Sequence, residues 1–223
     1  PYPIVALVGY TNAGKSTLFN RLTGAEVMAK DMLFATLDPT MRAVRLPTGI
    51  DVILSDTVGF ISDLPTELVA AFRATLEEVI AADIILHVRD ISHPNTAEQA
   101  RDVDQILSSL GVDEDVPLLE VWNKTDRLDP ESHDAMQARA SRDEGIFAAS
   151  ALTGEGLDIL LRAVTDRLQG DSTEEELRLS FDDGRRRAGL FDKGLVLGER
   201  QDDDATVLKV RWSAKDRAQF QTL

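Results

Sequence analysis

The stretch G-Y-T-N-A-G-K-S-T at residues 9–17 decides the fold that this sequence predicts. A short apolar, β-rich run precedes it, and the residues after it have the apolar spacing that is typical of a helix. The stretch fits the pattern G-x-x-x-x-G-K-[ST], in which glycines let backbone N–H groups turn inward around a phosphate. A strand before the motif and a helix after it favour a phosphate-binding loop over an ordinary turn.

This loop gives several of its residues a chemical role. Lys15 places a mobile positive charge near the β- and γ-phosphates, and the Ser16 hydroxyl coordinates Mg²⁺. The helix that follows directs its positive end at the phosphates. We therefore predict that the phosphates are bound by Gly9, Tyr10, Thr11, Asn12, Ala13, Gly14, Lys15, Ser16 and Thr17.

A second motif, D-T-V-G, follows the apolar stretch D-V-I-L-S-D. Asp56 is expected to hold Mg²⁺ through water, and the Gly59 N–H to contact the γ-phosphate. The pattern D-x-x-G is weak by itself, but it is stronger downstream of a phosphate loop and at the end of its own strand. The nucleotide-contacting residues of this motif are Asp56, Thr57, Val58 and Gly59.

A third motif, N-K-T-D, follows the apolar strand P-L-L-E-V-W and selects guanine. The Asp126 carboxylate accepts hydrogen bonds from guanine N1–H and the exocyclic amino group, and adenine would leave this carboxylate unpaired. Lys124 lies along the base, and Asn123 braces the phosphate loop. The triplet S-A-L ends the next strand, where the Ala151 N–H meets guanine O6. The predicted base-binding residues are Asn123, Lys124, Thr125, Asp126, Ser150, Ala151 and Leu152.

The segment L-F-A-T-L-D-P-T at residues 33–40 lies between the phosphate loop and Asp56. A threonine in such a loop can coordinate Mg²⁺ and sense the γ-phosphate, so that the loop switches between ordered and disordered states. On position alone, Thr36 and Thr40 are both candidates.

The residue after D-T-V-G is Phe60, where many such enzymes have a glutamine that positions water. Phosphoryl transfer depends mostly on positioning and charge neutralisation, so we expect slow intrinsic GTP hydrolysis that a partner raises. In some GTPases without the glutamine, an Asn at the place of Asn12 helps to coordinate K⁺. The alternative is that Asn12 only suits the turn. The candidate cofactors are Mg²⁺, GTP or GDP, and K⁺.

Strands and helices alternate along the chain, which predicts an open, mostly parallel sheet covered on both faces. The expected strands are 3–9, 41–47, 51–56, 83–90, 117–124 and 145–151. The expected helices are 15–24, 66–82, 95–111, 130–140 and 156–170. The strands at 41–47 and 51–56 are expected to form an antiparallel hairpin across T-G.

After residue 170 the pattern changes, so we expect a domain at 1–170 and a small α+β domain at 171–223. The polar, acidic D-S-T-E-E-E-L is expected to be a linker. Strand, helix, two strands joined by an acidic turn, and a final helix are expected after it. A tail of this size is too small for a robust core of its own, so we expect it to pack on something else.

These motifs resemble the translation-factor class of P-loop GTPases, and more closely the HflX family of ribosome-associated GTPases. The resemblance covers roughly residues 3–170 and is carried by G-Y-T-N-A-G-K-S-T-L-F-N-R-L-T-G, L-F-A-T-L-D-P-T, D-T-V-G-F-I-S-D-L-P, A-F-R-A-T-L-E-E-V and A-D-I-I-L-H-V-R-D-I-S. It implies a three-layer fold with a six-stranded sheet. The tail resembles the C-terminal domain of the family only loosely. The family's N-terminal domain and helical linker are missing, so we expect a piece of a longer protein.

The resemblance also implies roles for single residues. Thr36 would be the switch threonine, so the expected metal ligands are Ser16, Thr36 and Asp56. The expected catalytic residues are Lys15, Thr36 and Gly59. The nucleotide-facing part of the switch would be Phe34, Ala35, Thr36, Leu37 and Asp38.

As function, the resemblance implies binding to the large ribosomal subunit and, in bacterial members, splitting of stalled or stress-arrested ribosomes. A nucleotide-gated binding module with incidental hydrolysis is a second hypothesis, which Phe60 favours. A GTPase that supports tRNA modification or ribosome assembly is a third, although D-T-V-G-F-I-S-D-L-P is more similar to HflX.

Composition limits the partners. The net charge is −15, and residues 51–150 hold twenty-one acidic against seven basic residues, which opposes a broad RNA-binding face. The chain has no cysteine, no apolar run of membrane-spanning length and no secretion signal, so we expect a cytoplasmic protein. A monomer is expected as well, although the sequence does not reveal the oligomeric state. His87, Arg89 and Trp122 are expected to be packed strand residues. The three arginines at 185–187 are expected to form a solvated face rather than an RNA contact.

Overall fold

A computed structural model gives the structure of the chain. The residues that it describes are 2–24, 40–47, 49–57, 59–60, 76–170, 173–202, 204–212 and 214–221. The chain divides into two compact units, Pro1–Leu168 and Gln169–Leu223. Within the described residues, no helix is both long enough and apolar enough to cross a membrane.

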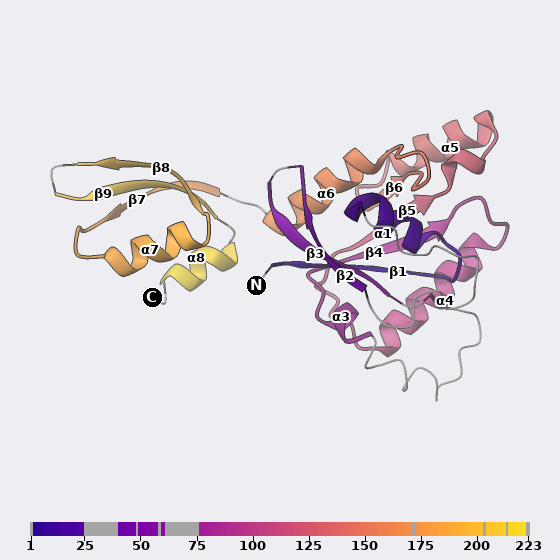
Figure 1. The fold of residues 1–223 in the computed structure, drawn as a ribbon, viewed down its shortest axis with the longest axis horizontal. Helices are drawn as coiled ribbons and strands as arrows, with labels where there is room; N and C mark the ends of the chain where they lie inside the picture. Colours follow the sequence, from indigo (N-terminus) through magenta and orange to yellow (C-terminus); the bar gives the residue numbers. More distant parts are fainter. Residues whose placement is uncertain are drawn as a thin grey trace. The chain divides into compact units, whose positions relative to one another are not determined.

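The first unit is built on one mixed sheet (Figure 1). Its strands are β1 (Ile4–Gly9), β2 (Thr40–Arg45), β3 (Asp51–Asp56), β4 (Ile84–Asp90), β5 (Leu118–Asn123) and β6 (Ile146–Ala148). The order across the sheet is β2-β3-β1-β4-β5-β6. Only the β2–β3 pair is antiparallel among these described strands, as the hairpin prediction requires.

Helices cover both faces of this sheet (Figure 1). The helices α1 (Lys15–Thr23) and α6 (Leu157–Gln169) pack on one face, where Phe19 and Leu160 meet the apolar side chains of the central strands. The helices α3 (Glu77–Ile80) and α4 (Thr96–Ser109) pack on the other face. On that face α5 (Pro130–Ala140) lies beside Trp122, which is buried as expected. The α/β three-layer prediction is confirmed.

Burial on two faces explains why the central strands are so apolar. The strand β4 reads I-I-L-H-V-R-D, and its first three residues are all buried, as strands of parallel sheets usually are. Parallel strands also bring their carboxyl ends to one edge, where ligands of open α/β sheets bind. The strands β1, β3, β4, β5 and β6 all end at this edge, so the loops that follow them can share one site.

One expected helix can be followed only in part. Of the stretch 66–82, the structure describes Leu76 and the residues after it, and Leu76 is buried as expected. Leu68 and Phe72 lie outside the described residues.

The second unit has a sheet of its own. Its elements are β7 (Thr173–Leu179), α7 (Gly184–Asp192), β8 (Val196–Gln201), β9 (Thr206–Trp212) and α8 (Ala214–Gln221). The order β7-β9-β8 is antiparallel throughout (Figure 1). This arrangement confirms a small α+β unit.

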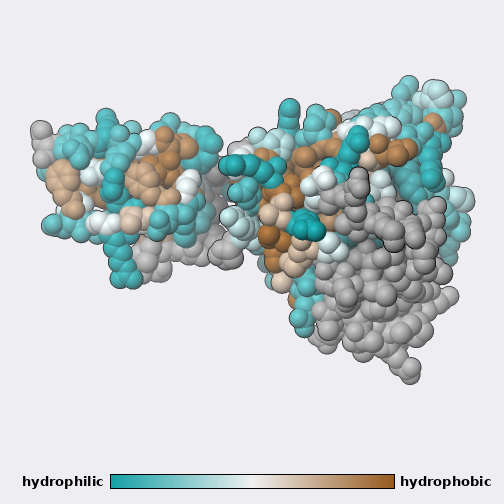
Figure 2. Space-filling view, viewed as in Figure 1, coloured by the Kyte–Doolittle hydropathy of each residue, from teal (hydrophilic) through white to brown (hydrophobic). Residues whose placement is uncertain are grey.

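Two expectations about the second unit are wrong. The unit has its own apolar cluster, made of Leu179, Leu190, Leu208, Val210 and Trp212, because one face of the sheet packs against helices. The acidic stretch expected as a linker is part of β7 from Thr173 onward. Its carboxylates are compensated across the sheet, since Glu174 pairs with Lys209 and Arg211. Figure 2 shows hydrophilic and hydrophobic residues side by side on the visible face of this unit.

Candidate nucleotide site

The phosphate-loop motif lies between β1 and α1. The strand ends at Gly9, and the helix begins at Lys15, which is buried. Gly14 has a φ of 101°, and a Cβ at this position would lie 2.2 Å from Nδ2 of Asn123. Because no side chain fits there, glycine is required for the loop to approach the end of β5 this closely.

The predicted metal ligands that the structure describes lie next to each other. The Ser16 hydroxyl donates a hydrogen bond to Oδ2 of Asp56 over 3.0 Å. Burial lowers the pKa of the Lys15 ammonium to about 8, although Asp56 acts to raise it. A hydroxyl and a carboxylate oxygen are hard donors of the kind that Mg²⁺ prefers. The donor set therefore fits this ion.

The residues around Phe60 are tied to the phosphate loop through their backbone. The Phe60 N–H donates to the Gly9 carbonyl over 3.0 Å, and the Thr11 N–H donates to the Phe60 carbonyl over 2.6 Å. The Phe60 ring is only 1 % exposed and packs with Val79 and other apolar side chains on the α4 face of the sheet. The ring therefore belongs to the core, in an apolar cluster against which Tyr10 of the phosphate loop also packs.

Gly59 lies directly against the phosphate loop. A Cβ at this position would lie 2.9 Å from Cα of Thr11 and 3.3 Å from Nζ of Lys15. Thr57, which follows β3, is held against β1, because its hydroxyl donates to the Leu7 carbonyl over 2.6 Å. The backbone of Gly59 is thus held beside the lysine that the motif assigns to the phosphates.

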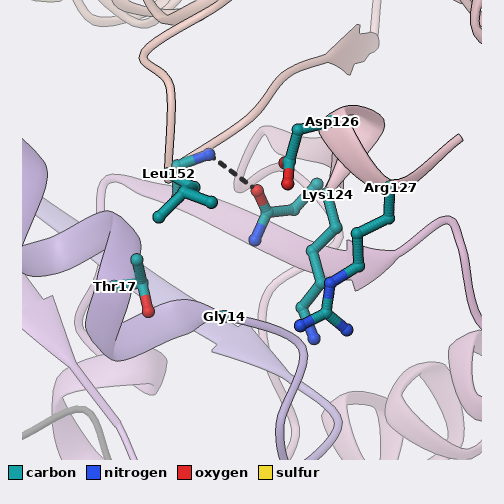
Figure 3. A pocket seen from close by; sticks show the side chains of 8 residues that line it. Gly14, Thr17, Lys124, Asp126, Arg127 and Leu152 are labelled. Carbon is teal, nitrogen blue, oxygen red and sulfur yellow. Dashed lines mark hydrogen bonds between the residues drawn. The ribbon is translucent and has the colours of Figure 1, made fainter.

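Most of the predicted base-binding residues line a pocket beside the phosphate loop, all but Thr125 and Ser150 (Figure 3). Asn123 joins three segments, since its Nδ2 donates to the Ala13 carbonyl over 2.9 Å and its Oδ1 accepts from the Ala151 N–H over 2.9 Å. The Ser150 hydroxyl donates to the Asp126 carboxylate and so orients it. The residues that line the pocket are Gly14, Thr17, Asn123, Lys124, Asp126, Arg127, Ala151 and Leu152.

Lys124 connects this pocket to the phosphate loop. Its ammonium donates to the Asn12 carbonyl over 2.6 Å and to Oδ2 of Asp90 over 2.8 Å. Lys124 and Asn12 both have a positive φ, 68° and 61°, a conformation that Asn tolerates better than most residues. This backbone geometry agrees with the turn interpretation of Asn12.

Nearly all predicted site residues within the described part of the chain gather at this edge of the sheet. They are Gly9, Tyr10, Thr11, Asn12, Ala13, Gly14, Lys15, Ser16, Thr17, Asp56, Thr57, Gly59, Asn123, Lys124, Thr125, Asp126, Ser150, Ala151 and Leu152. Val58 and the switch residues Phe34, Ala35, Thr36, Leu37 and Asp38 lie outside the described residues. Thr40, the other candidate switch threonine, begins β2 and is paired in register with Asp56.

Sequence reasoning missed two residues of this edge. Arg127 lines the pocket from the short helix η2 (Thr125–Arg127) (Figure 3). Asp90 ends β4 and holds Lys124. An acidic residue at the end of a strand that neighbours the N-K-T-D strand was the available signal, because such strand ends meet in a parallel sheet.

Two family models match the chain. The model for "50S ribosome-binding GTPase" matches residues 4–124, and the model for "HflX C-terminal domain" matches residues 135–222. The second match starts within α5, so it covers the end of the first unit as well as the second unit.

Individual proteins agree with these models. GTPase HflX of Magnetococcus marinus is 49% identical over 94% of this chain and 48% of its own length. GTPase HflX of Escherichia coli K12 is 42% identical over 96% of this chain and 50% of its own length. A solved GTP-binding protein of Sulfolobus solfataricus in complex with GDP has a TM-score of 0.58 at 28% identity, over 74% of this chain and 52% of that chain.

The chain spans about half the length of the curated relatives that it matches. Over that half, the relatives and the two family models indicate the same family of GTPases. The geometry of the phosphate loop, of Asp56 and of Asn123 agrees with this family. The chain therefore belongs to the HflX family of GTPases.

Proposed function

We propose that the chain is a GTP- and GDP-binding switch that hydrolyses GTP with Mg²⁺. The observation that carries this proposal is the position of Asn123, which holds the phosphate loop through Ala13 and the base loop through Ala151. One side chain thus sets the separation between the place of the phosphates and the place of the base. The carboxylate of Asp126, oriented by Ser150, then discriminates guanine from adenine.

The residues around Lys15 support phosphoryl transfer. Lys15 would neutralise negative charge on the β- and γ-phosphates. Ser16 and Asp56, which lie next to each other, would hold Mg²⁺, with Thr36 proposed as a third ligand. The metal supplies charge neutralisation across the phosphates when it is bound. Gly59 offers its backbone N–H next to Lys15. In the same way, Phe34–Asp38 and Val58 would complete the nucleotide-binding segments.

The intrinsic rate is expected to be slow. Phe60 is buried in the core, so it leaves the orientation of the attacking water to backbone groups, a cation or a partner. K⁺ held near Asn12 is one such cation. A partner that orders the switch segments would raise the rate, since hydrolysis depends on positioning.

We infer that this partner is the ribosome. The chain matches the 50S ribosome-binding GTPase model and relatives named GTPase HflX. The proposed protein binds the large subunit, splits stalled ribosomes and acts in the cytoplasm as a monomer. Its GTPase domain would end near residue 170, and residues 171–223 would form the C-terminal domain.

A nucleotide-gated binding module is the second candidate. The burial of Phe60 favours it, because a switch that only needs to hold GTP has no use for a residue that positions water. In that case hydrolysis would be incidental, and the nucleotide state would regulate binding. Multiple-turnover phosphate release that depends on Mg²⁺ would count against this candidate.

The deciding experiment measures phosphate release from GTP by the chain and by the full-length protein, with and without purified large ribosomal subunits. We expect slow release by the chain and strong stimulation of the full-length protein by the subunits. ATP in place of GTP is the matched control and should give no release. Absence of stimulation would remove the ribosome from the proposal, and absence of GTP binding would remove the nucleotide site.

A further inference from the structure

Two neighbouring ion pairs connect β4 with β5 and the residue that follows it. Arg89 contacts Glu120 over 2.6 Å, and Lys124 contacts Asp90 over 2.8 Å. Both are partly buried pairs at the same two strands. Only the second reaches the phosphate loop, because the Lys124 ammonium also donates to Asn12. The first is packed against the ring of Trp122 instead.

Ser92 holds the Asp90 carboxylate in place independently of Lys124. The backbone N–H of Ser92 donates to Oδ1 of Asp90 over 3.0 Å, and the Ser92 hydroxyl donates to the same oxygen. Oδ2 is left to accept from Lys124. Burial acts to raise the pKa of the Asp90 carboxyl, but the hydrogen bonds from Lys124 and Ser92 together lower it, so this carboxylate stays charged at neutral pH.

The contact that Asp90 supports joins two unusual backbone conformations. Among the described non-glycine residues, only Asn12 and Lys124 have a positive φ. Such conformations cost energy and persist only where the surroundings hold them. The hydrogen bond from Lys124 to the Asn12 carbonyl connects the two residues directly, over 2.6 Å. Because a lysine has a long flexible side chain, this hydrogen bond depends on a second contact that restricts the rotamers of Lys124.

We propose that Asp90 is a positioning residue of the nucleotide site, a role that rests on the proposed guanine-nucleotide function. Its carboxylate fixes the Lys124 ammonium, so that the lysine lies along the base and holds the Asn12 carbonyl of the phosphate loop at the same time. Asp90 thereby links the end of β4 to both halves of the nucleotide site without touching the nucleotide.

This role predicts an effect on nucleotide retention rather than on the chemical step. With Asp90 removed, the Lys124 side chain regains rotamer freedom and competes less well for Asn12. Both GDP and GTP should then dissociate faster. The rate of phosphate release at saturating GTP should stay nearly constant, while KM rises, because Asp90 acts through Lys124, whose ammonium contacts the Asn12 carbonyl and not the groups assigned to the metal and the γ-phosphate.

The first measurement is the dissociation rate of fluorescent GDP from the 223-residue chain. Asp90→Ala is expected to raise it about tenfold, the loss of one charge-assisted hydrogen bond. Glu120→Ala is the matched control, since it breaks the neighbouring ion pair on the same strands. The control should lower thermal stability and change the dissociation rate less than about twofold. Equal rates for Asp90→Ala and the wild type would overturn the role.

The second measurement separates positioning from a general loss of structure. In the Lys124→Ala background, Asp90→Ala should have no further effect on GDP dissociation, because Asp90 acts through that lysine. Additive effects of the two substitutions would show that Asp90 acts elsewhere and would refute the role. Should Asp90→Ala fail to fold, Asp90→Asn keeps the side-chain volume and should also speed dissociation.

GDP binding by the wild-type chain separates a failure of the proposed function from a failure of the role of Asp90. If the wild-type chain binds no GDP, the proposed function falls and the role of Asp90 falls with it. If the wild type binds GDP and neither Asp90 variant differs from it, only the role of Asp90 is wrong.

Discussion

The two units of this chain place their charged side chains in different ways. In the first unit, Asp90 and Lys124 form a pair with side chains that are 11 % and 19 % exposed, at the carboxyl ends of the neighbouring parallel strands β4 and β5. In the second unit, Arg178 and Asp204 form a pair with side chains that are 56 % and 81 % exposed. Both pairs have short contacts, but only the first lies beside the phosphate loop, where Lys124 also contacts Asn12.

This difference in exposure decides whether a salt bridge can be expected to fix local geometry. An exposed pair contributes about 0–1 kcal/mol and is weakened by salt. A buried polar contact is costly when it is broken, so it can fix the geometry of the segments that it joins. Charge in the first unit should therefore control ligand binding, whereas charge in the second should affect only local stability.

Among the charged residues of the two units, replacement of Lys15 is expected to have the largest effect on nucleotide binding. Lys15→Ala should weaken GTP binding or hydrolysis about a thousandfold, since the cation nearest the β- and γ-phosphates is lost. Equilibrium titration with fluorescent GTP analogues and phosphate-release assays measure this loss. Lys209→Ala, which removes a paired lysine from the second unit, is the matched control and should bind GTP normally. Normal hydrolysis by Lys15→Ala would refute the phosphate-loop assignment.

Asp126 tests the base-binding half of the site. Asp126→Asn should weaken GDP binding about a hundredfold and favour xanthosine nucleotides, because the new amide donates where guanine also donates. Competition titrations with GDP and xanthosine diphosphate give the preference directly. Asp204→Asn makes the same chemical change at an exposed pair and should leave it unaltered. An unchanged guanosine preference in Asp126→Asn contradicts the assignment.

Acid should act on the first unit through His87. Burial lowers the pKa of this ring to about 4, with Arg89 and Lys15 also lowering it and Glu120 opposing. Asp104 on α4 faces the ring over 3.7 Å. Because the unfolded chain binds the proton more readily, stability should fall as the pH drops from 6.5 to about 4, by about 3 kcal/mol in full.

Urea unfolding at a series of pH values measures this effect. Each unit has one buried tryptophan, Trp122 in the first and Trp212 in the second, so single Trp→Phe variants report on each unit separately. His87→Leu should flatten the pH dependence seen by Trp122. The pKa of His133 is raised by Asp134 and Glu155, so this residue adds stability at low pH that is lost as the pH rises through its folded pKa. An acid profile that His87→Leu leaves unchanged would exclude His87 as its source.

A smaller effect is expected from the cation in the buffer on the rate of GTP hydrolysis. If K⁺ bound near Asn12 does part of the work of the absent glutamine, phosphate release should be about threefold to tenfold faster in KCl than in NaCl. Equal ionic strength in both buffers controls for screening. Equal rates would remove K⁺ from the site and leave Asn12 as a turn residue.

The smallest effect is expected for the exposed charges of the second unit. Hydrogen bonds from Lys209 and Arg211 lower the pKa of Glu174 to about 2. The carboxylate therefore stabilises the folded unit above about pH 4.5, and this contribution is lost as the pH falls towards 2. Glu174→Gln should lower the Trp212-detected melting temperature by at most a few degrees and leave GDP binding unchanged. A large effect on GDP binding would break the distinction between the units.

Much of the first unit was predictable because its motifs combine local geometry with fixed chemistry. Glycines, a lysine and a hydroxyl at fixed spacing specify the loop from Gly9 to Ser16, and the apolar strands that flank the motifs specify where they lie. The contacts of Asn123 with Ala13 and Ala151 follow from the parallel order of the strands.

The remaining features depend on partners far away in the sequence. The acidic strand β7 looked like a linker because its compensating charges, Lys209 and Arg211, come more than thirty residues later. The role of Asp90 depends on a contact with Lys124 across thirty-four residues. No local pattern marks the charge pairing of β7, and the signal for Asp90 is only its place at the end of a strand, since the side chains meet only after the sheets have formed.

The burial of Phe60 also constrains any attempt to make this enzyme faster. Residue 60 serves the folded core through its ring and the phosphate loop through its backbone. Phe60→Gln would place an amide in an apolar cluster, at about 1–3 kcal/mol without new hydrogen bonds, or would turn the side chain outward and leave a cavity. Higher turnover should therefore be easier to reach through the proposed stimulating partner than by restoring a glutamine at this position.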